Sequence, residues 1–598
     1  MEQLRWFEAA AVVLAAALAL WSPRRAVRWC RAGSRRLGGL ARRRVWAVAL
    51  VGAAAFATSA ALSWVRWPVP RVQDEFSYLL AADTFAAGRL TNPTPPLAEH
   101  FESKHILVRP TYQSKYPPAQ GLFLALGQVL AGQPLAGVWL SWALACAALT
   151  WMLQGWVPPR WALLGGLLAA AHLGGMDEWL RGRYLYWSQS YWGGAVALLG
   201  GSLLFGGLRR IRLRPTLGAS AALGVGLVVL ALSRPFEGLV ASLPAMALVS
   251  VWAFRVGRQV PAARPPPERA KSSPPPPAQK GVRRGSDAPP AREIRRPGVW
   301  AARALLPAGA VLVLGLSFLG YYQYRVTGSP WRMPHRVHEE SSGTTPHFVL
   351  SWLRSDPSEA GAHEDRGSGG EVREDRRRRW LSYEYPRRYR WLWSFYLGPA
   401  LTLPFLAGLW AARRRRWTLF AAGTLVLVAA ANAATVAGFP HYYAPAAPLI
   451  LFLSVQGLRR LGAWRRRGRA GGRLLSGGLV AAALATFVAG AGVHVHYATG
   501  GSHPKIWSQY RAEIASRLET MDGRHLVLVR SPPPSPDRND EWVYNRADIE
   551  GAKVIWAREL GPEADARLLR HFRDRVLWSL RVDTRHMRFG PYGTLGDP

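Results

Sequence analysis

The chain has 598 residues, a formal net charge of +39 and 49% hydrophobic residues. The apolar residues are gathered into runs rich in Ala, Leu, Val, Gly and Trp, each about as long as a helix that crosses the hydrocarbon core of a bilayer, which excludes an ordinary soluble protein. The basic residues stand mostly in short Arg clusters between these runs. This pattern fits topology signals and anionic membrane lipid better than nucleic acid, so we expect no nucleic-acid partner.

The apolar runs predict a mainly α-helical, polytopic transmembrane bundle. The first run, 7–21, is followed rather than preceded by its basic residues, the reverse of a signal peptide, so we predict a retained span with its N-terminus outside. About twelve spans are predicted in all. They are 7–21, 45–65, 134–154, 161–175, 192–208, 217–233, 237–254, 299–320, 392–411, 417–437, 442–458 and 474–493.

The loops between these spans predict the orientation of the bundle. Strict alternation places the Arg-rich loop 22–44 inside together with the other short basic loops, as the positive-inside rule requires. It places the first loop, 66–133, the long loop 321–391 and the C-terminal tail outside. The stretch 255–298, rich in Arg and Pro, is interpreted as a disordered cytoplasmic linker. The short apolar segment 119–131 is interpreted as an interfacial helix rather than a span.

The first outer loop carries an acidic pair, Asp74 and Glu75, just past a span. A helix is predicted from about Gln73, because apolar residues supply one face, no proline interrupts the segment and Gly88 is a natural stop. Several cations follow. One of them, Lys115, directly precedes a Tyr-Pro-Pro turn whose prolines favour an extended approach to the next helix. A carboxylate pair and several cations at the mouth of a span favour chemistry on an anionic, lipid-linked molecule.

The tail 497–598 predicts a small soluble α/β domain outside the membrane. Strand patterns cover 525–530, 553–556 and 576–582, and an amphipathic helical pattern covers 562–573. The residues before this domain, 1–496, form the predicted transmembrane region.

These features together resemble the GT-C superfamily of integral-membrane glycosyltransferases, in particular bacterial proteins of the protein-mannosyltransferase and aminoarabinose-transferase type. The resemblance is carried by the Asp-Glu pair at 74–75, the Lys-Tyr-Pro-Pro sequence at 115–118 and, more weakly, the His-Tyr-Tyr-Ala-Pro sequence at 441–445. The span 7–21, which precedes the family's first helix, and the linker 255–298 depart from the family pattern.

The resemblance implies an enzyme that takes a sugar from a polyprenyl-phosphate donor and passes it, with inversion, to a protein, lipid or polysaccharide acceptor of the cell envelope. Because a phosphate ester is already a good leaving group, one base suffices. By its match to the family's first-loop carboxylate, Asp74 is that base. Glu75 is expected to orient the acceptor or to share a divalent metal, and the resemblance leaves this choice open.

The resemblance also implies fixed cations where the departing phosphate gains negative charge. Lys115, which matches the lysine of the family's turn, is the first, and Arg234, beside Glu237 at a span end, is the second. The remaining candidates contact the donor phosphate or line the substrate site; they are His441 for the phosphate, and Tyr116, Tyr442, Tyr443 and Glu237 for the substrate.

Each of these assignments has a structural alternative. Asp74 and Glu75 could merely cap the N-terminus of a juxtamembrane helix. Lys115 could extend along the span toward lipid headgroups. Arg234 could form an ordinary i, i+3 ion pair with Glu237.

Other polar and aromatic groups receive structural interpretations. Asp177 with Glu178 is a rival acidic pair, and Trp187 with Tyr191-Trp192 is interpreted as an interfacial aromatic belt. Two groups of histidines lack the spacing of a metal site and are interpreted as solvated loop residues. These groups are His335 and His338 with Glu339 and Glu340, and His494 and His496 with His503. Because Cys30 lies in an Arg-rich loop and Cys146 inside an apolar run, no disulfide is expected.

Two other functions stay open, a transporter or flippase of a lipid-linked saccharide and a non-catalytic membrane scaffold. A transporter would place ionisable groups at mid-span, where each is costly and marks a pathway; His172 and Asn432 are the nearest such polar residues. For the enzyme, the resemblance places the chain in the inner membrane of a bacterium, with its active site and C-terminal domain facing outside.

Overall fold

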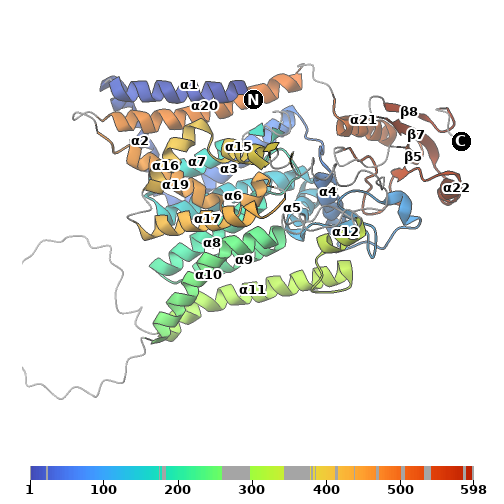
Figure 1. Ribbon diagram of the computed structural model, residues 1–598, viewed down its shortest axis with the longest axis horizontal. Helices are drawn as coiled ribbons and strands as arrows, with labels where there is room; N and C mark the ends of the chain where they lie inside the picture. The colour runs from blue at the N-terminus through green and yellow to red at the C-terminus, as the bar shows by residue number, and fades with distance from the viewer. Residues whose placement is uncertain are drawn as a thin grey trace, which may run out of the picture.

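The computed structural model describes residues 2–21, 24–173, 176–177, 184–258, 297–342, 378, 382–383, 385–410, 415–436, 438–465, 470–499, 505–530, 540–583 and 587–594. Most of the described chain is helical. The helices form an elongated bundle that carries the C-terminal sheet at one end (Figure 1). Most of the predicted linker 255–298, the greater part of the loop 321–391, Glu178 and His503 lie outside the described residues.

The helices of the chain follow one another with short connections in the first half. They are α1 (Glu2–Trp21), α2 (Arg24–Arg42), α3 (Arg44–Val65), α4 (Gln73–Ala86), α5 (Pro118–Ala131), α6 (Leu135–Trp156), α7 (Pro159–His172), α8 (Ala195–Leu213), α9 (Leu217–Ser233), α10 (Pro235–Arg258), α11 (Pro297–Thr327), α12 (Pro334–Ser342), α15 (Tyr385–Tyr396), α16 (Gly398–Trp410), α17 (Arg416–Ala433), α18 (Pro440–Tyr443), α19 (Ala447–Leu461), α20 (Gly471–Thr499), α21 (Trp507–Thr520) and α22 (Pro562–His571). The helix α2 replaces the loop that was predicted between the first two spans.

Seven of the described helices are long and apolar enough to cross a membrane. Their spans are Gln3–Trp21, Arg44–Val65, Leu135–Trp156, Pro235–Arg255, Ala302–Thr327, Arg416–Ala433 and Gly471–His496. The pair α15 and α16, bent by 87°, would make an eighth. The chain is therefore a multi-pass membrane protein, but the prediction of about twelve spans is not confirmed.

The difference arises from the lengths of individual helices. Each predicted span falls on a helix, yet α7, α9 and α19 have only 14, 17 and 15 residues. At 1.5 Å per residue, 14 residues reach about 21 Å, less than the roughly 30 Å of the hydrocarbon core. The apolar composition of these segments is right for a membrane, but the predicted segments themselves have only 15 to 17 residues, and the bounds of α9 equal those of its predicted span. The predicted interfacial segment is the 14-residue helix α5.

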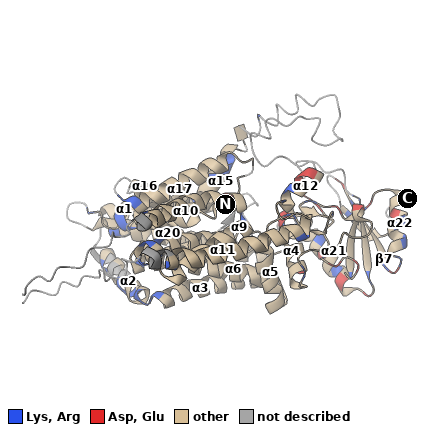
Figure 2. Cartoon of the chain, turned by 90° about the horizontal axis from the view of Figure 1, so that it is seen from below, with Lys and Arg blue, Asp and Glu red and all other residues tan. Residues whose placement is uncertain are grey.

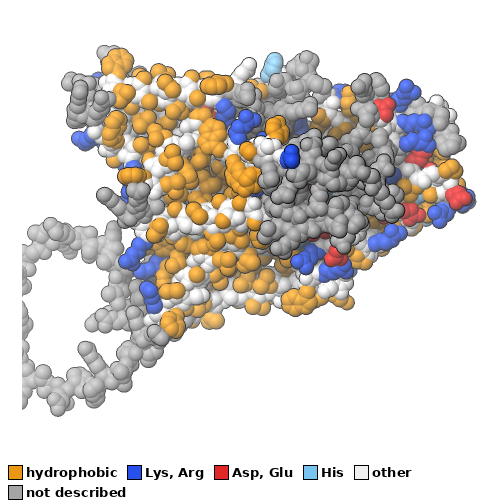
Figure 3. Space-filling model, viewed as in Figure 1, with side chains coloured by type: hydrophobic (Ala, Val, Ile, Leu, Met, Phe, Trp, Pro, Cys, Tyr) orange, Lys and Arg blue, Asp and Glu red, His pale blue; other side chains and the backbone are white. Residues whose placement is uncertain are grey.

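The two ends of the bundle differ in the charged residues that they carry. Figure 2 shows acidic residues gathered around α12, α21 and the C-terminal sheet, whereas the opposite end, near α2, is basic. We call these the domain end and the arginine end. At the arginine end, Arg209 and Arg210 of α8 lie over the rings of Trp417 and Trp151, at 4.7 Å and 3.7 Å. Between the ends, the face of the bundle in Figure 3 is covered with hydrophobic side chains.

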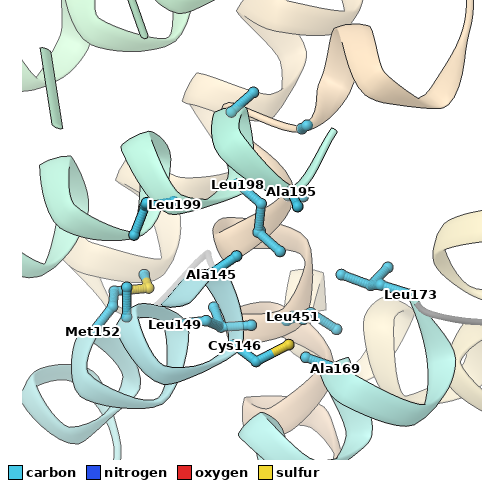
Figure 4. Close-up of a cluster of buried hydrophobic side chains, with 14 of the residues drawn as sticks. Ala145, Cys146, Leu149, Met152, Ala169, Leu173, Ala195, Leu198, Leu199 and Leu451 are labelled. Atoms are coloured by element: carbon cyan, nitrogen blue, oxygen red, sulfur yellow. The ribbon is translucent and has the colours of Figure 1, made fainter. Parts of the chain in front are cut away.

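The core of the bundle lies between α6, α7, α8 and α19, where small and branched side chains interlock (Figure 4). Close approach depends on glycine at the contact of α5 with α6. A Cβ added at Gly137 would lie 2.0 Å from the carbonyl oxygen of Phe123. Little hydrophobic force drives helices together inside a membrane, so their association depends on close packing. Small residues such as glycine allow this close approach. Both cysteines, Cys30 and Cys146, are free.

The C-terminal tail forms the predicted α/β unit with one further helix and one further strand. The strands are β5 (His525–Arg530), β6 (Val554–Arg558), β7 (Val576–Val582) and β8 (Met587–Pro591), in the order β6-β5-β7-β8. The strand β5 is parallel to both neighbours, with His525 opposite Val554 and Val576, and β7 is antiparallel to β8. The helix α21 packs on one face of this sheet through Ile514 and Leu518.

The other face of the sheet packs on the first loop. That loop holds α4, a short 3₁₀ helix (Ala98–Phe101) and the two-residue strands β1 (Ile106–Leu107) and β2 (Gln113–Ser114). Phe76 and Leu80 of α4 share one hydrophobic cluster with Leu528 of β5 and Leu568 of α22. The tail and the first loop therefore share a core, which places α4 between the sheet and the membrane bundle.

Candidate active site

The helix α4 begins where it was predicted, at Gln73, and Gly88 follows its end with a φ of 71°. Asp74 and Glu75 lie in its first turn, where their negative charge meets the positive end of the helix dipole. The two side chains have different surroundings. Glu75 is completely buried, whereas the side chain of Asp74 is 19% exposed.

The carboxylate of Glu75 is held by the backbone. One oxygen accepts hydrogen bonds from the amides of Arg71, at 2.6 Å, and Val72, at 3.3 Å. The other accepts from the amide of Tyr191, at 3.0 Å. These bonds cap α4 and tie it to the buried segment 186–194. The structure thus shows for Glu75 the capping role that was the alternative for the pair, and both oxygens are occupied by this role.

Asp74 faces the Tyr-Pro-Pro turn that precedes α5. The hydroxyl of Tyr116 donates a hydrogen bond to Oδ1 of Asp74, and Nε2 of His105 lies 3.9 Å from Oδ2. Burial, followed by the negative charge of Asp74, raises the pKa of Tyr116 well above its usual value, so the phenol stays protonated and remains a donor. Asp74 and Tyr116, two of the predicted site residues, are thus in direct contact.

Lys115 is the cation next to this carboxylate. Its Nζ lies 5.3 Å from the centre of the Tyr116 ring. Burial lowers the pKa of Lys115 to about 8, and the charges of Asp74 and then Glu339 oppose that shift. A partly desolvated ammonium group near a carboxylate is a cation that can act on a bound anion more strongly than a surface lysine.

Two histidines that were interpreted as solvated are buried instead. His338, on α12, is 4% exposed, and its Nε2 accepts a hydrogen bond of 3.1 Å from the amide of His105. The rings of His105 and His338 lie 5.8 Å apart. Burial lowers the pKa of His105 well below its usual value and that of His338 to about 3. The rings of His105 and His338 are therefore neutral at physiological pH. His494 is also buried, at 5% exposed.

The second side of the site lies at the junction of α9 and α10. The guanidinium of Arg234 lies 5.0 Å from the centre of the Tyr442 ring, and its Nη2 is buried with no hydrogen-bond partner among the described residues. Both Arg234 and Glu237 are described, and no close ion pair joins them, so the i, i+3 pair that was the structural alternative for Arg234 is not formed, although each charge acts on the other. Glu237 is 5% exposed.

Tyr78 links the two sides. Its ring stacks on that of Tyr116 at 4.7 Å. Burial raises the pKa of Tyr78 to about 12, and the charges of Arg234, Asp74 and Glu237 also act on this phenol. One carboxylate, two tyrosines and an arginine from α4, the first loop and the α9–α10 junction thus lie around one point at the domain end. Tyr78 could have been found from its spacing, because it follows Asp74 by one helical turn.

Other candidates face elsewhere. The Nδ1 atom of His441 is hydrogen-bonded to the hydroxyl of Tyr186 inside the bundle, where the ring stacks on Phe439 at 5.4 Å. Tyr443 lies toward Arg388 of α15, whose charge acts on it. The ring of His441 also lies 4.8 Å from that of Tyr442, so His441 borders the Arg234 side of the site, whereas Tyr443 lies toward α15.

The supposed aromatic belt is also internal. Trp187, Tyr191 and Trp192 are 1%, 5% and 4% exposed, and they pack within the core of the bundle. The rival acidic residue Asp177 lies in a two-residue strand paired with Tyr184 and Leu185.

No group of three or more His, Cys, Asp or Glu side chains in the described part of the chain is arranged to hold a metal ion. The carboxylate of Glu75, which was the candidate to share a divalent metal, is satisfied by backbone amides instead. The carboxylate oxygens of Glu75 therefore do not fit the role of metal ligands.

The C-terminal unit contacts α4 directly behind this site. The ring of Tyr544 stacks on Phe76 at 4.2 Å with an interplanar angle of 1°, and its hydroxyl donates to the carbonyl of Lys104. Asp83 accepts a hydrogen bond of 2.8 Å from the amide of Ala547. These contacts fix the orientation of α4 from the side opposite Asp74 and Tyr116. Sequence reasoning missed them because they join residues more than 400 positions apart.

No protein-family model and no curated protein matches the chain. Several solved structures are similar to it. One is the oligosaccharyltransferase of Archaeoglobus fulgidus in the apo form, at 11% identity and a TM-score of 0.41, over 81% of this chain and 62% of that one. Another is ArnT from Cupriavidus metallidurans in the apo state, at 13% identity and a TM-score of 0.43, over 88% and 92%. A third is AglB from Archaeoglobus fulgidus in complex with an inhibitory peptide and a dolichol-phosphate, at 10% identity and a TM-score of 0.41, over 89% and 69%.

The chain thus spans less than two thirds of the length of the first of these proteins. At these TM-scores the likeness says nothing by itself about substrate or mechanism.

Proposed function

We propose that this protein is a membrane glycosyltransferase that moves a sugar from a polyprenyl-phosphate donor to an envelope acceptor, a protein, lipid or polysaccharide, with inversion and with Asp74 as the base. The observation that carries the proposal is the position of Asp74. It is a partly exposed carboxylate at the domain end of the bundle, oriented by Tyr116 and close to the charge of Lys115.

The proposed step is a single displacement at the anomeric carbon. The acceptor oxygen forms a bond to this carbon while the bond to the donor phosphate oxygen breaks and leaves its electron pair on the phosphate. The acceptor proton passes to Asp74, and Oδ2 is the atom that remains for it because Oδ1 accepts from Tyr116.

The leaving phosphate gains negative charge and requires donors fixed in advance. Arg234 supports this role, because its buried Nη2 atom has no partner among the described residues and such an atom is costly unless a ligand satisfies it. Lys115 supplies a second cation on the Asp74 side. Tyr78, Tyr442 and Glu237 lie around these groups and would contact the sugar.

The proposed orientation follows the same separation of charge. The arginine end would face the cytoplasm, as the positive-inside rule requires, and the domain end, with Asp74 and the C-terminal unit, would face the outside of a bacterial inner membrane.

The test is donor consumption by purified, reconstituted protein carrying Asp74→Asn. Because a general base contributes about 10²- to 10⁴-fold, we expect turnover to fall by that factor while expression and melting temperature stay normal. Glu102→Gln is the matched control, because this carboxylate lies in the same loop and its side chain is 64% exposed. Turnover by Asp74→Asn equal to that of the control would refute the assignment of the base.

A further inference from the structure

A groove of about 260 Å³ lies at the domain end, apart from the residues grouped around Asp74. It is bounded by the chain just after α3, from Arg66 to Arg71, by His494 near the end of α20, and by α21. The groove thus lies where two apolar spans meet the C-terminal unit. A ligand there would contact the membrane surface and the soluble unit together.

The charges that line this groove are mainly positive. Arg66 forms no ion pair within the described residues, and burial together with the nearby charge of Arg71 lowers the pKa of its guanidinium. The acidic residue in the lining, Glu513, is already paired with Lys505, at 2.7 Å. Two neighbouring guanidinium groups in one groove form a site that favours a phosphate.

His494 adds a buried polar atom to this groove. Its side chain is 5% exposed, and its Nε2 is 3.2 Å from the carbonyl oxygen of Leu62, so Nε2 carries the proton. The other ring nitrogen, Nδ1, is buried and has no hydrogen-bond partner among the described residues. In this tautomer Nδ1 is an acceptor, and it requires a hydroxyl or an N–H from a ligand.

The surroundings favour a ligand from the membrane. Trp64 and Trp67 are 83% and 49% exposed beside the groove, and Val65 is 44% exposed. Exposed tryptophan at the end of an apolar span is typical of the membrane–water interface. Leu50 and Phe56, further along α3, are also exposed, and these side chains would contact the acyl chains.

We propose that this groove binds the headgroup of an anionic phospholipid, with Arg66 and Arg71 holding the phosphodiester and Nδ1 of His494 accepting a hydrogen bond from a headgroup hydroxyl. Phosphatidylglycerol has this chemistry. The site is separate from the proposed reaction, and the bound lipid would connect α21 to the membrane surface.

The first test is native mass spectrometry of the full-length protein in detergent, titrated with phosphatidylglycerol. We expect the wild-type protein to bind one lipid that the Arg66→Gln/Arg71→Gln variant binds about tenfold more weakly, since losing one charge-assisted contact alone has an effect of this size. Arg89→Gln is the control, because Arg89 is an exposed arginine at the same end of the bundle. Equal affinity of the double variant and the control would overturn the proposal.

The second test uses the wild-type protein, so it does not depend on the folding of a variant. A phosphatidylglycerol analogue with a photoreactive headgroup should crosslink to the segments 66–71 and 509–516. Crosslinks confined to other surfaces would overturn the proposal. In a parallel arm, excess soluble glycerol phosphate should leave this crosslink in place. Its complete loss would show a site for small phosphates and would overturn the assignment to a lipid.

Discussion

Replacing Glu75 with glutamine separates a structural from a catalytic role for the acidic pair. The carboxylate accepts from three backbone amides, those of Arg71, Val72 and Tyr191, in a fully buried position. Glutamine keeps one acceptor oxygen and turns an NH₂ group toward the amides on the other side. At least one charge-assisted hydrogen bond is lost, about 1.5–3 kcal/mol, and at least one buried amide is left without an acceptor, about 1–3 kcal/mol. We therefore expect Glu75→Gln to lower the free energy of unfolding by about 2.5–6 kcal/mol.

The assay is thermal unfolding of the detergent-purified protein, followed by tryptophan fluorescence, together with donor turnover. Glu75→Gln should lower the melting temperature and the yield, and the folded fraction should keep measurable turnover. Asp74→Asn should show the opposite pattern, and Glu102→Gln should match the wild type in both measurements. A Glu75→Gln protein with the melting temperature of the wild type and no turnover would refute this reasoning, because it would show that the carboxylate acts in the reaction.

Three further predictions follow from single contacts. Because the Lys115 ammonium has a pKa of about 8 and carries its charge below that value, kcat/KM should fall as pH rises through about 8, and Lys115→Arg should remove this alkaline limb from the pH profile. Phe76→Ala should destabilise the protein by about 3–5 kcal/mol in chemical or thermal unfolding by deleting the ring that stacks on Tyr544, whereas Phe76→Leu should cost less. Gly137→Ala should lower the melting temperature because its Cβ would meet a carbonyl oxygen at 2.0 Å, whereas Gly423→Ala, with open space around it, should not. Unchanged pH profiles or melting temperatures would contradict each prediction in turn.

Much of the fold was predictable because it depends on local patterns. Apolar runs predicted where the membrane helices lie, and alternating patterns predicted β5, β6, β7 and α22 within a few residues. The start of α4 at Gln73 was predictable for the same reason. The number of spans was not, because helix ends depend on turns and on packing against neighbours rather than on the length of the apolar run.

The site was predictable only where its residues are close in sequence to a recognisable pattern. Asp74, Lys115 and Tyr116 belong to the first loop, and the structure brings Asp74 and Tyr116 into contact. The neighbouring His105 and His338 lie 5.8 Å apart although the chain separates them widely, and no local signal links them. The solvated character assigned to His338 was therefore wrong.

By itself the sequence determined that this is a mainly helical, multi-pass membrane protein. The reason is that hydrophobic periodicity and the placement of arginine can be recognised in each segment alone. Only the tertiary structure decided which of two adjacent carboxylates remains open to a ligand. Asp74 and Glu75 have nearly the same chemistry and lie in the same helical turn. Successive residues of a helix point about 100° apart, so one side chain turns into backbone amides of the bundle and the other faces Tyr116 and His105.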